Sequence, residues 1–178
     1  MSVTLASGEI RIRTLSRSDS IDELTRLLNR AYRQYAEDGL LFLASHQDAD
    51  VTRHRIGAGA CFVAELGSKI AGTITYHFPC QSVALHTAKC VQVARIAQLA
   101  VDPDQWGGGI GSRLMSHAEC RARRDGADEL ALDTAESASR LIAWYCSLGY
   151  QIVSSFGATC TNYRSVIMSK DLRGELSR

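Results

Sequence analysis

The sequence predicts an α/β domain in which strands and helices alternate along the chain. Three neighbouring features lead to this prediction: an apolar segment of alternating pattern at 91–101, a glycine cluster directly after it, and apolar residues at helical spacing beyond the cluster. At 178 residues the chain is long enough to bury a substantial core. We therefore expect one domain over residues 1–178, with its core at about 9–170.

Composition and charge are typical of a globular domain. Apolar residues make up 46% of the chain, charged residues make up 22%, and the net charge is +1. A charge so close to zero gives no strong field that would attract nucleic acid or a membrane surface. The chain has no run of about 18 apolar residues, and its first residues lack the basic and apolar segments of a signal peptide. We expect a cytoplasmic protein without nucleic-acid or membrane partners.

The cysteines are expected to be free thiols. They form no Cys-x-x-Cys pair and have no histidine cluster beside them, so the sequence predicts neither a zinc site nor a disulfide framework. The six positions are Cys61, Cys80, Cys90, Cys120, Cys146 and Cys160.

The first third of the chain predicts one strand and two helices. Glu9–Arg13 alternates polar and apolar residues, which is typical of a strand. Ser20 and Glu23 have the spacing of a capping box, so a helix is expected from there to about Gly39. A shorter helix is expected at about 48–57.

A β-hairpin is predicted next, followed by the central strand. Cys61–Leu66 and Ile70–Phe78 are its two strands, with a turn at 67–69, and Pro79 is expected to end the second strand. In the central strand, five apolar residues share one face that only Arg95 interrupts. They are Val91, Val93, Ala97, Leu99 and Val101.

The last part of the chain continues the alternation. After the helix that begins near Ile110, a turn at Asp125-Gly126 is followed by a strand at Glu129–Asp133. A helix is expected at Ser137–Leu148. Two further strands are expected at 150–153 and 163–168.

The glycine turn between the central strand and its helix predicts a phosphate site. Glycines let the backbone approach a ligand closely, and the N–H groups of the first helical turn attract anions. A Walker A loop would need a lysine, which Gly109-Ile110-Gly111-Ser112 lacks, and the spacing of a dinucleotide fingerprint is also not met. Two interpretations are left: a turn that binds another phosphate-containing ligand, or a turn that only packs the strand against the helix.

Two segments resemble the GNAT N-acetyltransferase superfamily. Trp106-Gly107-Gly108-Gly109-Ile110-Gly111 is similar to its Gln/Arg-x-x-Gly-x-Gly/Ala motif, and Leu141–Tyr150 resembles its helix that carries a Tyr and ends at Leu-Gly-Phe/Tyr. Two positions depart from the pattern. Trp106 stands where Gln or Arg is usual, unless Gln105 takes that part, and Ala138 stands where many members have Asn.

The resemblance implies a fold and an activity. The fold would be a mixed, mostly antiparallel sheet of six to seven strands with about four helices. The activity would be transfer of an acetyl group from acetyl-CoA, without a metal, to a primary amine of a small molecule or to an exposed Lys or N-terminus, by direct attack on the thioester. The alternatives are a catalytically degenerate acyl-CoA sensor and a nucleotide-binding regulator. Members often dimerise, which leaves a homodimer open.

The resemblance also implies positions for the co-substrate. The strand before the glycine turn would splay from the strand after the next helix, and the pantetheine arm would lie in that gap. Arg113 is either a further phosphate contact or a surface residue. The expected cofactor-binding residues are Leu99, Ala100, Val101, Trp106, Gly107, Gly108, Gly109, Ile110, Gly111, Ser112, Ser137, Ala138 and Tyr145.

Tyr145 is the side chain expected to take part in the chemistry. A phenol stays protonated at neutral pH and can protonate the departing thiolate, a role that the resemblance implies for this position. The alternative is a tyrosine that only packs.

The sequence indicates the residues that would contact the acceptor amine less clearly than those that would bind the co-substrate. Tyr35 is an expected substrate contact, and Tyr32, Phe42 and His46 are further candidates unless the aromatic ones are core residues. Arg95 stands where some members carry a catalytic Glu; it either binds an acidic group of the acceptor or pairs with a carboxylate at the start of its strand. The general base could then be His77, Glu65 or a chain of water molecules, and His77 is also an expected substrate contact.

Overall fold

The computed structural model describes residues 9–83, 90–157 and 161–175. In this part of the chain a seven-stranded sheet has the strand order β1-β2-β3-β4-β5-β7-β6. All neighbouring strands are antiparallel except β4 and β5, which are parallel. The strands are β1 (Ile10–Thr14), β2 (Ala60–Leu66), β3 (Lys69–Val83), β4 (Cys90–Val101), β5 (Glu129–Ala135), β6 (Gln151–Phe156) and β7 (Ser165–Asp171).

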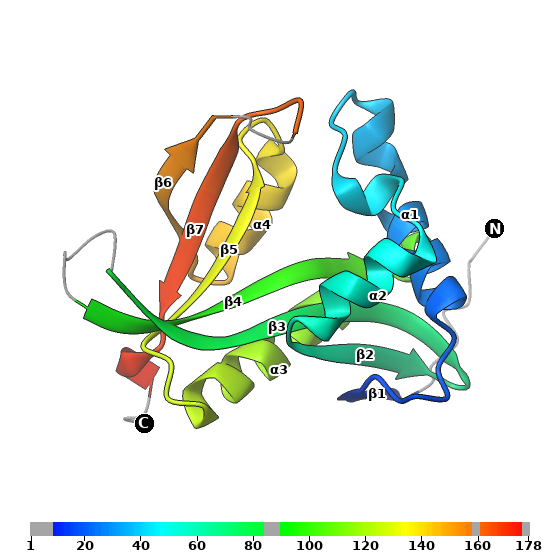
Figure 1. The fold of residues 1–178 in the computed structure, drawn as a ribbon, viewed down its shortest axis with the longest axis horizontal. Coiled ribbons are helices and arrows are strands. Elements are labelled where there is room, and N and C mark those ends of the chain that lie inside the picture. Colours follow the sequence, from blue (N-terminus) through cyan, green and yellow to red (C-terminus); the bar gives the residue numbers. More distant parts are fainter. Residues whose placement is uncertain (1–8, 84–89, 158–160, 176–178) are drawn as a thin grey trace.

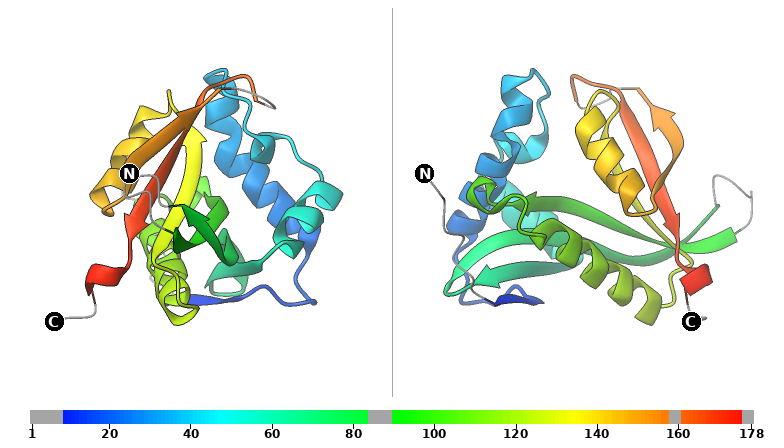
Figure 2. Two further views of the ribbon diagram at one scale, coloured as in Figure 1. Left: turned by 60° about the vertical axis from the view of Figure 1, so that its left-hand side comes forward. Right: turned by 180° about the vertical axis from the view of Figure 1, so that it is seen from behind.

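Four α-helices in the described residues cover the two faces of this sheet (Figures 1 and 2). Helices α1 and α2 lie on the face turned to the viewer in Figure 1, and α3 and α4 lie on the opposite face, seen from behind in Figure 2. The mixed, mostly antiparallel sheet with four helices confirms the expected fold class. The helices are α1 (Ile21–Glu37), α2 (Ala49–Gly57), α3 (Ile110–Arg124) and α4 (Ser139–Ser147), and short 3-10 turns lie at Leu43–Ser45, Pro103–Gln105 and Arg173–Glu175.

Each face of the sheet has its own buried cluster, since side chains alternate between faces along a strand. On β2, Phe62 and Ala64 pack with α3 and α4, whereas Val63 packs with α1. The amphipathic patterns predicted for α1 and α3 match these clusters, because Leu24 and Leu28 of α1 and Leu114 and Ala118 of α3 are fully buried.

The predicted helix starts are confirmed by their caps. The Ser20 side chain accepts a hydrogen bond from the Glu23 N–H, and the Asp48 side chain accepts one from the Val51 N–H. Each cap satisfies one of the free donors of the first helical turn. Helix α4 begins two residues later than predicted, at Ser139, with Ala138 as its N-cap residue.

Two predictions for the central strands are wrong. Strand β3 continues through Pro79 to Val83, because the pairing with β4 shifts register between His77 and Cys80, where a residue without an N–H is tolerated. The side chains of β4 do not keep one buried face as predicted. Ala94 and Ile96 pack in the cluster of α3 and α4, and after the irregularity between Ala97 and Ala100 it is Leu99 and Val101 that pack against this cluster, whereas Ala100 packs with α1.

Five of the six cysteines lie in the described residues, and all five are free thiols: Cys61, Cys80, Cys90, Cys120 and Cys146. The expectation for Cys160 lies outside the described residues. No helix in the described part of the chain is long and apolar enough to cross a membrane.

Candidate active site

The sheet is split at its parallel pair. Strands β4 and β5 pair only at residues 93–95 with 129–131, and beyond these residues the two strands diverge (Figure 1). Among the described strands, the later half of β4 therefore has β3 as a partner on one side and none on the other.

A bulge bends β4 where the split opens. Ala97 pairs with Thr75 of β3 and Ala100 pairs with Thr73, so β4 has one residue more than β3 in this segment. Gln98, inside the segment, has a φ of 52°, in the left-handed region that residues other than glycine rarely adopt. The buried Gln98 amide holds this conformation, because its Nε2 donates to Thr75 Oγ1 at 3.2 Å and its Oε1 accepts from Gln47 Nε2 at 2.9 Å. Such conformations persist only where the surroundings hold them.

The polar backbone groups of Leu99 and Val101 face the split. Orientation alternates along a strand, and the N–H of the following residue, Asp102, donates to Ala71 O of β3. Two aromatic side chains bond to the exposed carbonyls: the Tyr32 hydroxyl donates to Leu99 O at 2.9 Å, and Trp106 Nε1 donates to Val101 O at 2.9 Å. Ala100, between them, pairs with Thr73 of β3.

The glycine turn presents the start of α3 to the same split. Gly107 and Gly109 have φ values of 80° and 77°, and nothing lies within 4 Å of the Cβ that either would gain. Gly109 is the N-cap residue of α3, and no side chain caps the helix there, so the N–H groups of its first turn are available to an anion. Gly111 has a packing role as well, because its Cβ would lie 3.3 Å from the Trp144 ring of α4.

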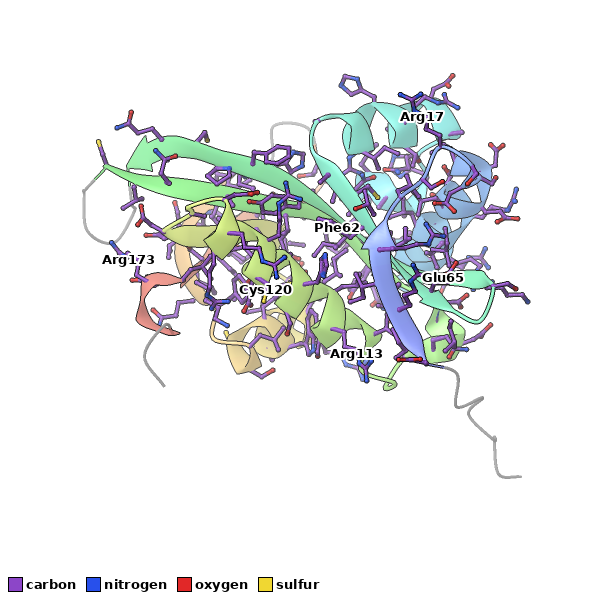
Figure 3. The ribbon with its side chains drawn as sticks, turned by 90° about the horizontal axis from the view of Figure 1, so that it is seen from below. Arg17, Phe62, Glu65, Arg113, Cys120 and Arg173 are labelled. Atoms are coloured by element: carbon purple, nitrogen blue, oxygen red, sulfur yellow. The ribbon has the colours of Figure 1, made fainter. Side chains whose placement is uncertain are left out.

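These features line one cavity of about 550 Å³. Its lining includes most residues that the sequence predicts for the co-substrate: Leu99, Ala100, Val101, Trp106, Gly107, Gly109, Ile110, Gly111, Ser112 and Tyr145. Tyr32, Tyr35 and Gln105 also line it, whereas Gly108, Ser137 and Ala138 do not. Arg113 is exposed on α3 and lines a separate groove beside β1, on the side of the molecule seen in Figure 3.

Tyr145 is a buried phenol at this cavity. Burial raises its pKa well above the ordinary value of 10.0, and the nearby Tyr32, Tyr35 and Asp133 raise it further. Within the described residues its hydroxyl makes no hydrogen bond, and its ring packs at 5.0 Å from Trp144 and 6.0 Å from Tyr150. Tyr145 therefore holds its proton at neutral pH next to the space that a ligand would fill.

The predicted acceptor residues Arg95 and His77 are register partners on β4 and β3, outside the cavity lining. Arg95 Nη2 lies 3.5 Å from Asp133 Oδ1. Arg95 therefore pairs with a carboxylate, as one of its two interpretations predicted, but the carboxylate belongs to the neighbouring strand β5 and not to the start of β4. The prediction of Glu65 as a base has no support in the geometry. Glu65 lies on β2 and its Oε1 is 3.1 Å from Arg13, away from the split.

The candidate aromatic contacts form a cluster beside the cavity. Phe42 packs against Tyr32 and Tyr35 with ring-centroid distances of 5.4 and 5.2 Å, and against Tyr163 at 4.9 Å. Since Tyr163 precedes β7, this cluster joins α1 to the other arm of the split, as do hydrogen bonds of Asn162 with residues 39 and 41. His46 is exposed, and its ring Nδ1 lies within hydrogen-bond distance of Ser45 Oγ, at 3.1 Å.

Sequence reasoning missed Arg55, Gln98, Asp133 and Tyr163. Asp133 had a usable signal, since it is an exposed carboxylate in a strand whose other residues are all buried. Arg55 and Gln98 depend on tertiary contacts and have no such signal. In the described residues no group of three or more His, Cys, Asp or Glu side chains could hold a metal ion.

A mixed sheet split at its parallel pair, with a glycine turn and a helix N-terminus at the split, defines the class of an acyl-CoA-dependent acyltransferase. The chain belongs to the acetyltransferase (GNAT) family, whose model matches residues 21–150. It is also 32% identical over 157 residues to S-(2-succino)cysteine N-acetyltransferase of Bacillus subtilis, with 87% of this chain and 92% of that protein covered. The protein is therefore an N-acetyltransferase with acetyl-CoA as co-substrate.

Solved structures agree on the fold. The ribosomal-protein-S18-alanine N-acetyltransferase of Escherichia coli matches with a TM-score of 0.66 and 21% identity, covering 92% of this chain and 94% of that one. An acetyltransferase of Bacillus subtilis in complex with CoA matches with a TM-score of 0.64 and 19% identity, covering 92% and 99%.

Proposed function

We propose that the protein transfers the acetyl group of acetyl-CoA to the primary amine of a small-molecule acceptor, which attacks the thioester directly. The observation that carries this proposal is that the glycine turn, the free side of β4 and Tyr145 all line one cavity. Bound acetyl-CoA supplies an activated acetyl group. A single cavity with donors at both ends fits a long ligand with an anionic group at one end and a reactive carbonyl at the other.

The backbone supplies the binding groups. The uncapped N–H groups at the start of α3 would bind the pyrophosphate, and Gly107 and Gly109 leave the space for its approach. The N–H groups of Leu99 and Val101 would face the pantetheine arm, because their carbonyls already face the split. One of these N–H groups would also polarise the thioester carbonyl.

Tyr145 would protonate the departing thiolate. A general acid must hold its proton until the transfer, and burial raises the pKa of this phenol well above its ordinary value. Its position supports this role, because Tyr145 lines the same cavity as Leu99, Ala100 and Val101 of β4.

The acceptor that we propose is a small amino acid derivative. The support is the relative that acts on S-(2-succino)cysteine, together with the charged residues Arg95 and Asp133 at the split. A peptide N-terminus or a lysine is the second candidate acceptor.

The proposal is tested by the rate of CoA release from acetyl-CoA with a panel of amines. We expect S-(2-succino)cysteine or a related amino acid to accelerate release and to yield an N-acetylated product. A peptide bearing N-terminal alanine is expected to have a lower kcat/KM. If acetyl-CoA raises the Tm while no amine accelerates CoA release, the protein is a sensor and the proposal is wrong.

A further inference from the structure

Arg55 is a partly buried cation that no carboxylate of the described residues neutralises. Its side chain extends from α2, and its one hydrogen bond there is from Nη1 to the neutral amide oxygen of Gln47. The residue is half-buried, and this burial lowers the pKa of the guanidinium from its ordinary value. Charged groups removed from water are normally paired.

The surroundings of Arg55 come from both arms of the split. The groups that act on it electrostatically are Tyr32 of α1, Asp133 of β5 and Tyr163 before β7. Tyr32 also donates to Leu99 O on the bulged strand. Arg55 does not itself line the cavity, but it neighbours Tyr32, which does, and Asp133 of the opposite arm. We take this as the side from which an acceptor would approach the thioester.

The charged side chains around Arg55 have a net positive charge that favours a bound anion. Asp133 is the one carboxylate among the groups that act on Arg55, and its Oδ1 already lies 3.5 Å from Arg95 Nη2. Two arginines and one aspartate give a local net charge of +1. Because guanidinium groups bind carboxylates with two parallel hydrogen bonds, a carboxylate is the ligand chemistry that fits.

The position of Arg55 is tied to the bulge of β4. Gln47, which accepts from Arg55, donates to Thr52 Oγ1 at 2.7 Å and to Gln98 Oε1 at 2.9 Å. Gln47, Thr52 and Gln98 are all buried. This hydrogen-bond chain places the guanidinium at a defined position relative to the strand that carries Leu99.

We propose that Arg55 binds a carboxylate of the acceptor and so makes the enzyme selective for amines that carry one. This inference rests on the proposed function, since it names the class of acceptor. It assigns to Arg55 the anion-binding role that the sequence analysis offered for Arg95, whose carboxylate partner is Asp133.

The test compares two acceptors and three variants. S-(2-succino)cysteine carries carboxylates, and 2-(ethylthio)ethylamine keeps the thioether and the primary amine without them. Arg55→Gln removes the charge, and Arg55→Lys keeps it. Arg53→Gln is the matched control, because Arg53 is an exposed arginine of the same helix that pairs with Asp50.

We expect Arg55→Gln to lower kcat/KM for S-(2-succino)cysteine by about 10- to 100-fold, the usual effect of a lost charged hydrogen bond. Arg55→Lys should keep part of the activity. The kcat/KM for 2-(ethylthio)ethylamine and all values for Arg53→Gln should stay near wild type. An equal loss for both acceptors would show a structural role, and no loss would show that another group binds the carboxylate; either result overturns the inference.

Binding measured by calorimetry separates this inference from the proposed function. S-(2-succino)cysteine is titrated into the CoA-saturated wild type and into Arg55→Gln. Weaker binding by the variant supports the inference even if the wild type turns over no amine, in which case only the proposed function fails. Equal binding by both, or no binding by the wild type, overturns the inference.

Discussion

The hydroxyl of Tyr32 on α1 donates a hydrogen bond to the carbonyl oxygen of Leu99 on β4 at 2.9 Å. This bond joins the helix that borders the cavity to the free side of the split strand. Together with the Trp106–Val101 bond, it occupies the carbonyls that face the split. If acetyl-CoA binds at this split, as we propose, it meets a strand whose carbonyls are already bonded to aromatic side chains.

Tyr32→Phe tests this bond. We expect a loss of about 1 kcal/mol in the free energy of unfolding, because the Leu99 carbonyl loses its donor. Urea denaturation measures the change. Tyr35→Phe is the control, since the Tyr35 hydroxyl makes no hydrogen bond within the described residues although its ring lies 5.8 Å from that of Tyr32. Equal stability losses in the two variants would contradict the prediction.

Gly72 lets α3 pack closely on the sheet. A Cβ there would lie 2.9 Å from Ile110 Cγ2 and 3.0 Å from Leu114 Cδ1. Gly72→Ala should therefore destabilise the fold by about 1–3 kcal/mol through overpacking. Gly57→Ala, where nothing lies within 4 Å of the added Cβ, should have no such penalty. Denaturation midpoints compare the two, and a neutral Gly72→Ala would refute this packing.

Tyr145→Phe separates acid catalysis from packing. The variant keeps the buried ring and loses only the acidic proton, so we expect kcat to fall by about 100-fold or more. The Kd for acetyl-CoA should change little. Steady-state CoA release and calorimetry measure the two quantities. A kcat equal to that of the wild type would show that Tyr145 only packs.

His117 gives the fold a pH dependence. Its ring packs at 4.5 Å from Phe62, and burial, followed by Arg124 and Arg121, lowers its pKa below the ordinary value of 6.5. As pH falls below that value, the unfolded chain takes up a proton that the folded protein resists, so stability declines. His117→Gln should therefore flatten the fall in Tm between about pH 7 and about pH 5. Parallel Tm curves for wild type and variant would contradict this.

Elements with a strong local signal were predicted well from the sequence. The cap at Ser20, the shorter helix near residue 48 and the turn at Asp125-Gly126 each depend on a few neighbouring residues, and the structure has each of them. The split of the sheet followed from the family resemblance and not from the pattern of β4.

Features that depend on distant contacts were not predictable. The bulge at Gln98 is stabilised because Gln47 and Thr75 form hydrogen bonds with its buried amide. Both partners are distant in sequence, so the residue pattern of β4 does not indicate them. The same bulge explains the error in the buried face, since an inserted residue shifts the alternation. The prediction that Pro79 ends the strand was wrong for a related reason, because an irregularity in the pairing of β3 with β4 accommodates the proline.

The most direct measurement is the Tm of the wild type and of Gly109→Asp with acetyl-CoA, CoA, ATP and NAD. We expect both CoA compounds to stabilise the wild type, by about 2.7 kcal/mol at a hundredfold excess over Kd, and ATP and NAD to do so far less. Gly109→Asp puts a negative side chain at the start of α3 and should abolish the shift. Gly126→Asp, at a glycine with a similar φ at the other end of α3, should keep it. A folded wild type without a CoA shift, or a Gly109→Asp variant that keeps the full shift, would contradict the assignment of the glycine turn and the split as the acetyl-CoA site.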